Sequence, residues 1–126
     1  MVVFDTSTLL FHLFEPEKLS KIAVDTIDQA NEIIISAISI WEIGLKVKKG
    51  KLNIPLSATE MVKILQRAEK IRFYSVDVET WLENVSLDWH HQDPADRTIV
   101  ATARLLNCPL ITSDMTIRDF YETAVW

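Results

Sequence analysis

The sequence of 126 residues predicts an α/β fold, in which a parallel sheet carries helices on both faces. Two observations support this fold class. Short apolar or β-branched runs alternate along the chain with segments of helical period, which is the pattern of βαβ units. The hydrophobic share of 48% and a length near the common domain size allow one buried core. We therefore expect residues 1–126 to form a single domain.

The first three elements are two strands with a helix between them. The apolar run Val2–Phe4 predicts a buried strand that ends at Asp5. Pro16 is followed by apolar residues at helical spacing as far as Ala30, which predicts a helix with proline in its first turn. The β-branched run Ile33–Ile35 then predicts a second strand.

The middle of the chain contains two amphipathic helices and a third strand. Helical spacing with interleaved lysines runs over Ser39–Lys49 and stops at Gly50. A second amphipathic pattern covers Ser57–Ile71. Phe73–Val76 predicts a strand, and a short helix through Trp81–Val85 follows it.

The last third of the chain predicts two helices and two strands. A helix over Pro94–Asn107 is marked by Asp before its first proline, and Pro109–Thr112 reads as a strand. A turn or short helix over Thr116–Tyr121 precedes a closing edge strand at Ala124–Trp126.

The net charge of −5 hides an uneven distribution. Residues 43–72 hold eight basic and two acidic side chains, between two acidic flanks. A net negative protein is an unusual nucleic-acid binder, but a local basic segment can still attract a polyanion. The alternative without a function in binding is that this segment forms a solvent-exposed helix face.

Composition excludes several classes of site and location. Cys108 is the only cysteine, so an internal disulfide is impossible and a reducing cytoplasm is the expected location. The chain has only two glycines, too few for the glycine-rich motif of a dinucleotide-binding site or of a phosphate-binding loop. The N-terminus shows no signal-peptide pattern, and the apolar runs are too short to span a membrane.

Four acidic residues fall where a site would form, beyond the carboxyl ends of the strands. They are Asp5, Glu42, Asp96 and Asp114. Structural roles exist for some of them: Asp93 can cap a helix with Asp96 in its first turn, and Glu42 can pair with Lys46. Asp5 interrupts a buried run, however, and an acidic residue in an apolar setting needs a partner.

Converging carboxylates predict a bound cation, because several such groups cannot all stay ionised without one. Oxygen-only ligands favour Mg²⁺ or Mn²⁺, which can activate water and stabilise charge on a phosphodiester. His90 and His91 are interpreted as structural or substrate-facing residues. Basic side chains that could hold flanking phosphates are Lys46, Lys48, Lys49, Arg97 and Arg118.

Four segments in this order resemble the PIN-domain family, and within it the VapC-type ribonuclease toxins. They are FDTSTLL at 4–10, ISAISIWEIGLK at 35–46, HQDPADRTIVA at 91–101 and LITSD at 110–114. The family's acidic quartet maps onto Asp5, Glu42, Asp96 and Asp114, and Asp93 matches the cap position. Asp119 is a second candidate near the last position, but Asp114 directly follows the strand.

The resemblance implies a three-layer PIN-like fold with about five parallel strands. It also implies a Mg²⁺- or Mn²⁺-dependent endoribonuclease that uses the four acids as catalytic and metal-binding residues. The implied partners are an RNA substrate, a VapB-like antitoxin that blocks the site, and a second copy in a homodimer.

Two other functions stay open at this level. A phospho-signalling receiver has this length and an acidic pocket, but it needs paired acids after the first strand and a lysine after the last. Here a single Asp5 follows the first strand, and no lysine follows Lys70. A PIN-like binding module with a vestigial site is the second alternative, and it should bind neither metal.

Overall fold

The computed structural model describes residues 1–126 and contains one sheet of five parallel strands. The strand order is β3-β2-β1-β4-β5, which places the first strand at the centre. The strands are β1 (Val2–Phe4), β2 (Ile33–Ser36), β3 (Ile71–Tyr74), β4 (Leu110–Ile111) and β5 (Ala124–Val125). The predicted fold class, an α/β sheet of about five parallel strands, is confirmed.

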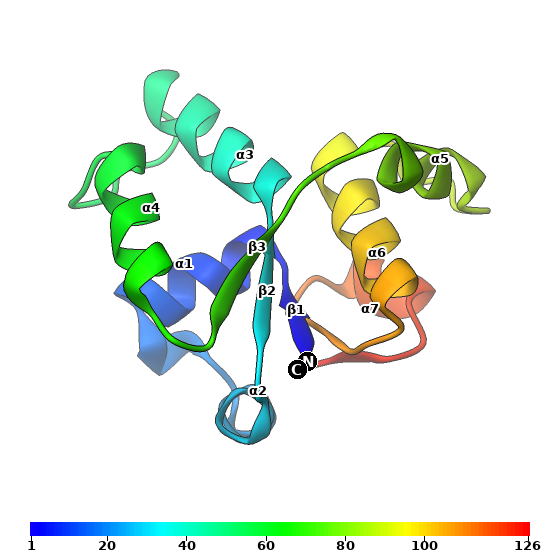
Figure 1. The fold of residues 1–126 in the computed structure, drawn as a ribbon, viewed down its shortest axis with the longest axis horizontal. Coiled ribbons are helices and arrows are strands. Elements are labelled where there is room, and N and C mark those ends of the chain that lie inside the picture. Colours follow the sequence, from blue (N-terminus) through cyan, green and yellow to red (C-terminus); the bar gives the residue numbers. More distant parts are fainter.

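Helices cover both faces of this sheet (Figure 1). One face carries α1 (Thr6–Phe14), α2 (Lys21–Gln29), α3 (Ala37–Lys48) and α4 (Ala58–Arg67), with a short 3₁₀ turn, η1 (Pro16–Lys18). The other face carries α5 (Val78–Ser86), α6 (Pro94–Leu106) and α7 (Met115–Phe120). The three layers follow from the need to bury both faces of a parallel sheet.

Alternating residues of the central strands feed two separate apolar cores. Phe4 and Ile35 pack with Leu9 of α1 in the core on one face. Val3 and Ile34 pack with residues of α6 and α7 in the core on the other face. This period of two is the geometry of a strand buried on both sides, and it explains why these runs are continuously apolar.

Several predicted boundaries differ from the structure. The helix α1 is not among the predicted elements, and Pro16 begins η1 instead of the first turn of α2. The predicted helix Ser57–Ile71 is too long: α4 ends at Arg67, and Ile71 already belongs to β3. The backbone of Ala68, the C-cap residue, is extended, and this ends the helix.

None of the helices combines the length and the apolar character required to cross a bilayer.

Candidate active site

A cleft of about 410 Å³ opens at the carboxyl ends of β1 and β4. These strands lie where the sheet order reverses, because the chain runs from β1 to β2 on one side and reaches β4 on the other. Five carboxylates and two lysines line the cleft with five other residues. The lining is Asp5, Thr6, Ser7, Leu10, Glu42, Ile43, Lys46, Lys51, Leu52, Asp93, Asp96 and Asp114.

Asp5 is the most deeply buried of these acids, with only 4% of its surface exposed. It follows β1 and caps α1, since its Oδ1 accepts a hydrogen bond of 2.8 Å from the amide of Thr8. Its Oδ2 accepts a hydrogen bond from the hydroxyl of Thr112. Burial raises the pKa of Asp5 above its ordinary value, although these hydrogen bonds oppose the rise.

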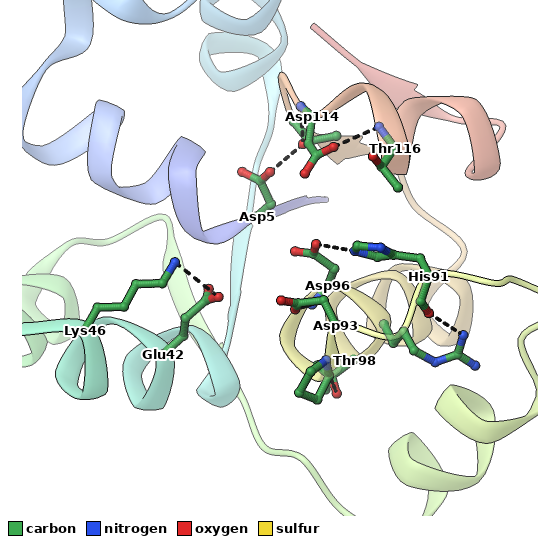
Figure 2. Close-up of polar contacts among 12 residues, drawn as sticks. Asp5, Glu42, Lys46, His91, Asp93, Asp96, Thr98, Asp114 and Thr116 are labelled. Atoms are coloured by element: carbon green, nitrogen blue, oxygen red, sulfur yellow. Dashed lines mark hydrogen bonds and ion pairs between the residues drawn. The ribbon is translucent and has the colours of Figure 1, made fainter. Parts of the chain in front are cut away.

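Asp96 lies in the first turn of α6, and its carboxylate approaches the same space as Asp5 (Figure 2). Its Oδ2 is 2.7 Å from Nε2 of His91. Burial raises the pKa of Asp96 to about 6, with smaller contributions in the same direction from the charges of Asp93 and Asp114. The hydrogen bond from His91 partly offsets this rise.

Asp114 follows β4 and begins α7. Its Oδ1 accepts a hydrogen bond of 2.8 Å from the amide of Thr116, and its own amide donates to the hydroxyl of Thr112 over 3.0 Å. Thr112 therefore connects Asp114 to Asp5. The charge of Asp114 raises the pKa of both Asp5 and Asp96, so the three acids form one electrostatic group.

Glu42 reaches the cleft from α3, with 14% of its side chain exposed. Its Oε2 is 3.5 Å from Nζ of Lys46, one helical turn further along (Figure 2). Lys46 and Lys51 both line the cleft, so cationic groups lie beside the acids. The arrangement offers carboxylate oxygens for a cation and ammonium groups for an anion.

The sequence also matches a model of a known protein family, which identifies the family of this chain. Residues 2–124 match the model described as "PIN domain". The chain belongs to the PIN domain family. This membership sets aside the receiver-domain alternative for residues 2–124.

Individual relatives of this PIN domain agree with the assignment. Ribonuclease VapC22 of Mycobacterium tuberculosis (strain ATCC 25618 / H37Rv) is 28% identical over 119 residues, which cover 94% of this chain and 90% of VapC22. The chain also superposes on a structure of a toxin-antitoxin complex from Klebsiella pneumoniae, with a TM-score of 0.68 and 20% identity. That match covers all of this chain and 97% of the solved one.

A second solved structure has the same fold. It is VapBC2 from Rickettsia felis bound to a DNA fragment from their promoter, with a TM-score of 0.70 and 13% identity. The superposition covers all of this PIN domain and 98% of the solved chain.

The structure brings all four sequence-predicted acids of the PIN domain to one cleft, and it adds Asp93, the N-cap of α6. Asp119 is exposed and lies outside the cleft. Arg97 was a candidate for phosphate binding, but its guanidinium donates to the carbonyls of Asn84, Leu87, Trp89 and His91. Arg97 is therefore a structural residue.

Sequence reasoning missed two contributors to the cleft, Thr112 and Lys51. Thr112 stands at the end of a strand, where only the fold shows that its hydroxyl reaches Asp5. Lys51 follows Gly50, outside the predicted helix, and its return to the cleft depends on the loop after α3.

The residues of the cleft fit a hard divalent cation by their chemistry. All five acids supply oxygen donors, and burial raises the pKa of Asp5 and Asp96 despite their hydrogen bonds, which favours a positive partner. No three His, Cys, Asp or Glu side chains are grouped tightly enough to hold one ion together. A cation with several water ligands, such as Mg²⁺, suits this loose arrangement.

Proposed function

We propose that this PIN domain, residues 1–126, is a Mg²⁺- or Mn²⁺-dependent endoribonuclease and the toxin of a toxin–antitoxin pair. The observation that carries the proposal is the cleft, where five acids meet two lysines at the switch point of the sheet. Its relative VapC22 is named a ribonuclease, and the Klebsiella pneumoniae structure is described as a toxin–antitoxin complex.

In this proposal Asp5 and Asp96 would hold the principal cation, and Glu42 and Asp114 would complete the set of carboxylates around it. When bound, such a cation lowers the pKa of water and offsets charge on a phosphodiester. The chain's own contribution is to hold the acids in place: Thr112 and the amide of Thr8 fix Asp5.

The lysines of the cleft have a separate role in the proposal. Lys46 and Lys51 contact phosphates that flank the cleaved bond, because their ammonium groups line the same cleft as the acids. Lys49 is a third candidate for phosphate binding, because it lines an adjoining groove together with Lys46 and Lys51.

The decisive experiment replaces Asp5 and Asp96, the proposed ligands of the principal cation, one at a time. Asp5→Asn and Asp96→Asn keep a similar shape and should fold, but each should lose most of the Mg²⁺- or Mn²⁺-dependent cleavage of RNA, as expected when a ligand of a catalytic metal is removed. Asp119→Asn is the matched control, because Asp119 is exposed and outside the cleft. Full activity in either Asp5→Asn or Asp96→Asn would overturn the assignment of that residue to the metal site.

A binding module with a vestigial site is the remaining alternative. A titration with Mn²⁺ distinguishes it, because a vestigial cleft should bind neither Mn²⁺ nor Mg²⁺ and should leave RNA intact. If the site is functional, the wild-type protein should bind Mn²⁺, and Asp96→Asn should bind it more weakly.

An apolar groove beside the cleft supports an antitoxin partner. The groove has a volume of about 290 Å³, and it shares Ser7, Leu10 and Leu52 with the cleft. Its other lining residues are Phe11, Phe14, Glu15, Asn53, Ile54 and Pro55. A partner segment that places apolar side chains in the groove and a cationic side chain in the acidic cleft would block the site.

The groove proposal is tested by coexpression with the product of a short neighbouring reading frame. Ile54→Glu should weaken that complex by at least tenfold and leave RNA cleavage intact, because it buries a charge in the apolar groove. Unchanged affinity in Ile54→Glu would place the partner elsewhere.

The homodimer remains part of the proposal, and an exposed apolar patch supports it. The exposed members of the patch are Trp41 of α3 and one face of α5, formed by Val78, Trp81, Leu82 and Val85. A hollow between Trp41 and Trp81 is also lined by the buried Ile38 and the half-buried Val76. Trp41 is 55% exposed and Val85 78% exposed. Contiguous apolar surface of this kind marks interfaces, and a two-fold axis lets one patch cover its own copy.

A further inference from the structure

We propose that His91 is a positioning residue that fixes the orientation of the Asp96 carboxylate; this inference rests on the proposed metal-dependent function. The Nε2 atom of His91 lies 2.7 Å from Oδ2 of Asp96. His91 itself is not among the residues that line the cleft, and its ring approaches Asp96 from the side of the α5–α6 connection (Figure 2). Its effect on a bound cation therefore passes through Asp96.

Asp96 depends on this contact more than the buried Asp5 depends on either of its own. The carboxylate of Asp5 accepts two hydrogen bonds, one from the backbone amide of Thr8 and one from the hydroxyl of Thr112. The Asp96 carboxylate accepts a hydrogen bond from His91 alone. Without His91, rotation of this side chain has no hydrogen bond to oppose it.

The ring of His91 is held by aromatic neighbours. It packs on Trp89 with a distance of 4.8 Å between ring centroids. Trp89 in turn stacks on Phe120 of α7, at 4.6 Å and an angle of 10° between the rings. The rings of His91 and Trp89 are tilted by 45°, and this packing against a stacked pair restricts the motion of the imidazole, so His91 presents Nε2 in a defined direction.

The backbone that carries His91 is fastened by Arg97, the residue after Asp96. Nη1 of Arg97 donates to the carbonyls of Trp89 and His91 at 2.7 and 3.0 Å. Nη2 donates to the carbonyls of Asn84 and Leu87 at 2.7 and 3.2 Å. Because Asp96 and Arg97 are neighbours on α6, the hydrogen bonds of Arg97 hold the backbone of His91 at a fixed distance from the Asp96 carboxylate.

The requirement at position 91 is a nitrogen donor at the position of Nε2. An ionised Asp96 can only accept a hydrogen bond, so His91 must carry a proton on Nε2 when the acid is charged. A glutamine amide reaches about as far and also donates, whereas alanine cannot. Outer-shell partners of metal ligands typically change metal affinity about 10- to 100-fold when removed.

The test is a titration of Mn²⁺ alone, followed by calorimetry, on folded variants of the whole chain. His91→Ala should weaken Mn²⁺ binding by about tenfold or more, while His91→Gln should stay within about threefold of wild type. His90→Ala is the matched control, because His90 is exposed and makes no hydrogen bond in the structure; it should bind as wild type. In an Asp96→Asn background, His91→Ala should add no further loss.

A metal-free measurement tests the contact directly. In ¹⁵N NMR spectra at neutral pH, His91 should be protonated on Nε2, and its Nε2 shift should move in Asp96→Asn but not in Asp119→Asn. A proton on Nδ1 alone would overturn the inference.

The outcomes separate the inference from the function on which it rests. Wild-type Mn²⁺ affinity in His91→Ala, beside weakened binding in Asp96→Asn, would overturn the role of His91 and leave the proposed function standing. Weakened binding that glutamine does not restore, together with a lower unfolding temperature, would show a merely structural role and also overturn it. A wild-type protein without Mn²⁺ binding would overturn both.

Discussion

The acids of the cleft are held by the protein's own donors. Asp5, Asp96 and Asp114 each accept a hydrogen bond from a neighbouring amide, hydroxyl or imidazole. Such bonds preorganise a donor set, because the side chains lose less freedom when a ligand arrives. They do not compensate fully for burial, since the pKa of Asp5 and Asp96 stays raised.

The raised pKa of Asp96 predicts how the stability of the metal-free protein depends on pH. The pKa rises from 3.8 to about 6 on folding, so the native state binds more protons than the unfolded chain between these values. The stability contributed by the protonated group is complete below pH 3.8 and is lost as pH rises through about 6. Asp96→Asn should therefore melt at a higher temperature than wild type at pH 7, with a difference that shrinks toward pH 4.

Thermal melts in a chelator at several pH values measure this effect. Asp119→Asn serves as the control, and its melting should follow wild type throughout, because Asp119 is exposed. Parallel pH curves for wild type and Asp96→Asn would contradict the prediction.

The acidic residues of the site were open to prediction from sequence, whereas their partners were not. Asp5 stands directly after β1 and Asp114 shortly after β4, and parallel strands bring their carboxyl ends to one edge. The partners Thr112 and His91 act across the fold, and no local pattern separates a site threonine from an ordinary strand residue. Arg97 was misassigned because a charged residue next to a site suggests ligand binding until its carbonyl partners are known.

At the level of elements, three helices begin at the cleft. Asp5 caps α1, Asp93 caps α6 and Asp114 caps α7, each by accepting a backbone hydrogen bond in the first turn. Acidic N-caps also interact favourably with the helix dipole. These three carboxylates therefore stabilise helices in addition to any role in the site.

The cap of α7 gives a prediction that separates the two functions of Asp114. Asp114→Ala removes the acceptor for the Thr116 amide and should lower the free energy of unfolding by about 1 kcal/mol. Asp114→Asn keeps an acceptor and should stay near wild-type stability. Both variants should lose metal-dependent cleavage of RNA.

Urea unfolding monitored by circular dichroism, beside an RNA cleavage assay, checks both parts. Equal stability in the two variants would show that the cap does not contribute, and cleavage by Asp114→Asn would remove Asp114 from the site.

Element prediction succeeded where the hydrophobic period was long and failed where two elements adjoin. The strand before Asp5 and the helix after Pro94 have clear patterns, and both are confirmed within about one residue. The helix α1 begins directly after β1, and its first turn, Thr6–Thr8, is polar and lacks an amphipathic signal. At the other failure, α4 and β3 are separated by only three residues, so one apolar pattern runs into the next.

At the level of the whole molecule, the basic middle segment and the acidic cleft are neighbours. Lys46 and Lys51 belong to the segment with the excess of positive charge, and both line the acid-rich cleft. The net charge of −5 therefore does not describe the field that a polyanion meets near the site.

The exposed apolar patch predicts the oligomeric state. Val85→Glu places a charge within the exposed apolar face of α5 and should shift the protein toward monomer by at least about tenfold in dissociation constant. Ile22→Glu is the control, because Ile22 is 59% exposed on α2, away from the patch. Sedimentation equilibrium measures the shift. A monomeric wild-type protein, or a dimer that Val85→Glu leaves intact, would contradict the proposed interface.

The three helix caps in the cleft have a consequence for how the gene tolerates change. Some replacements in the cleft would inactivate the proposed ribonuclease and still let the chain fold. At positions 5 and 114 such folded but inactive variants should be dominated by Asn and Ser, which still cap a helix. Glu42 caps nothing and lies mid-helix, so position 42 should accept a broad range of helix-forming residues. The range of replacements found among folded, inactive variants would then show which acids support the architecture and which serve the proposed chemistry alone.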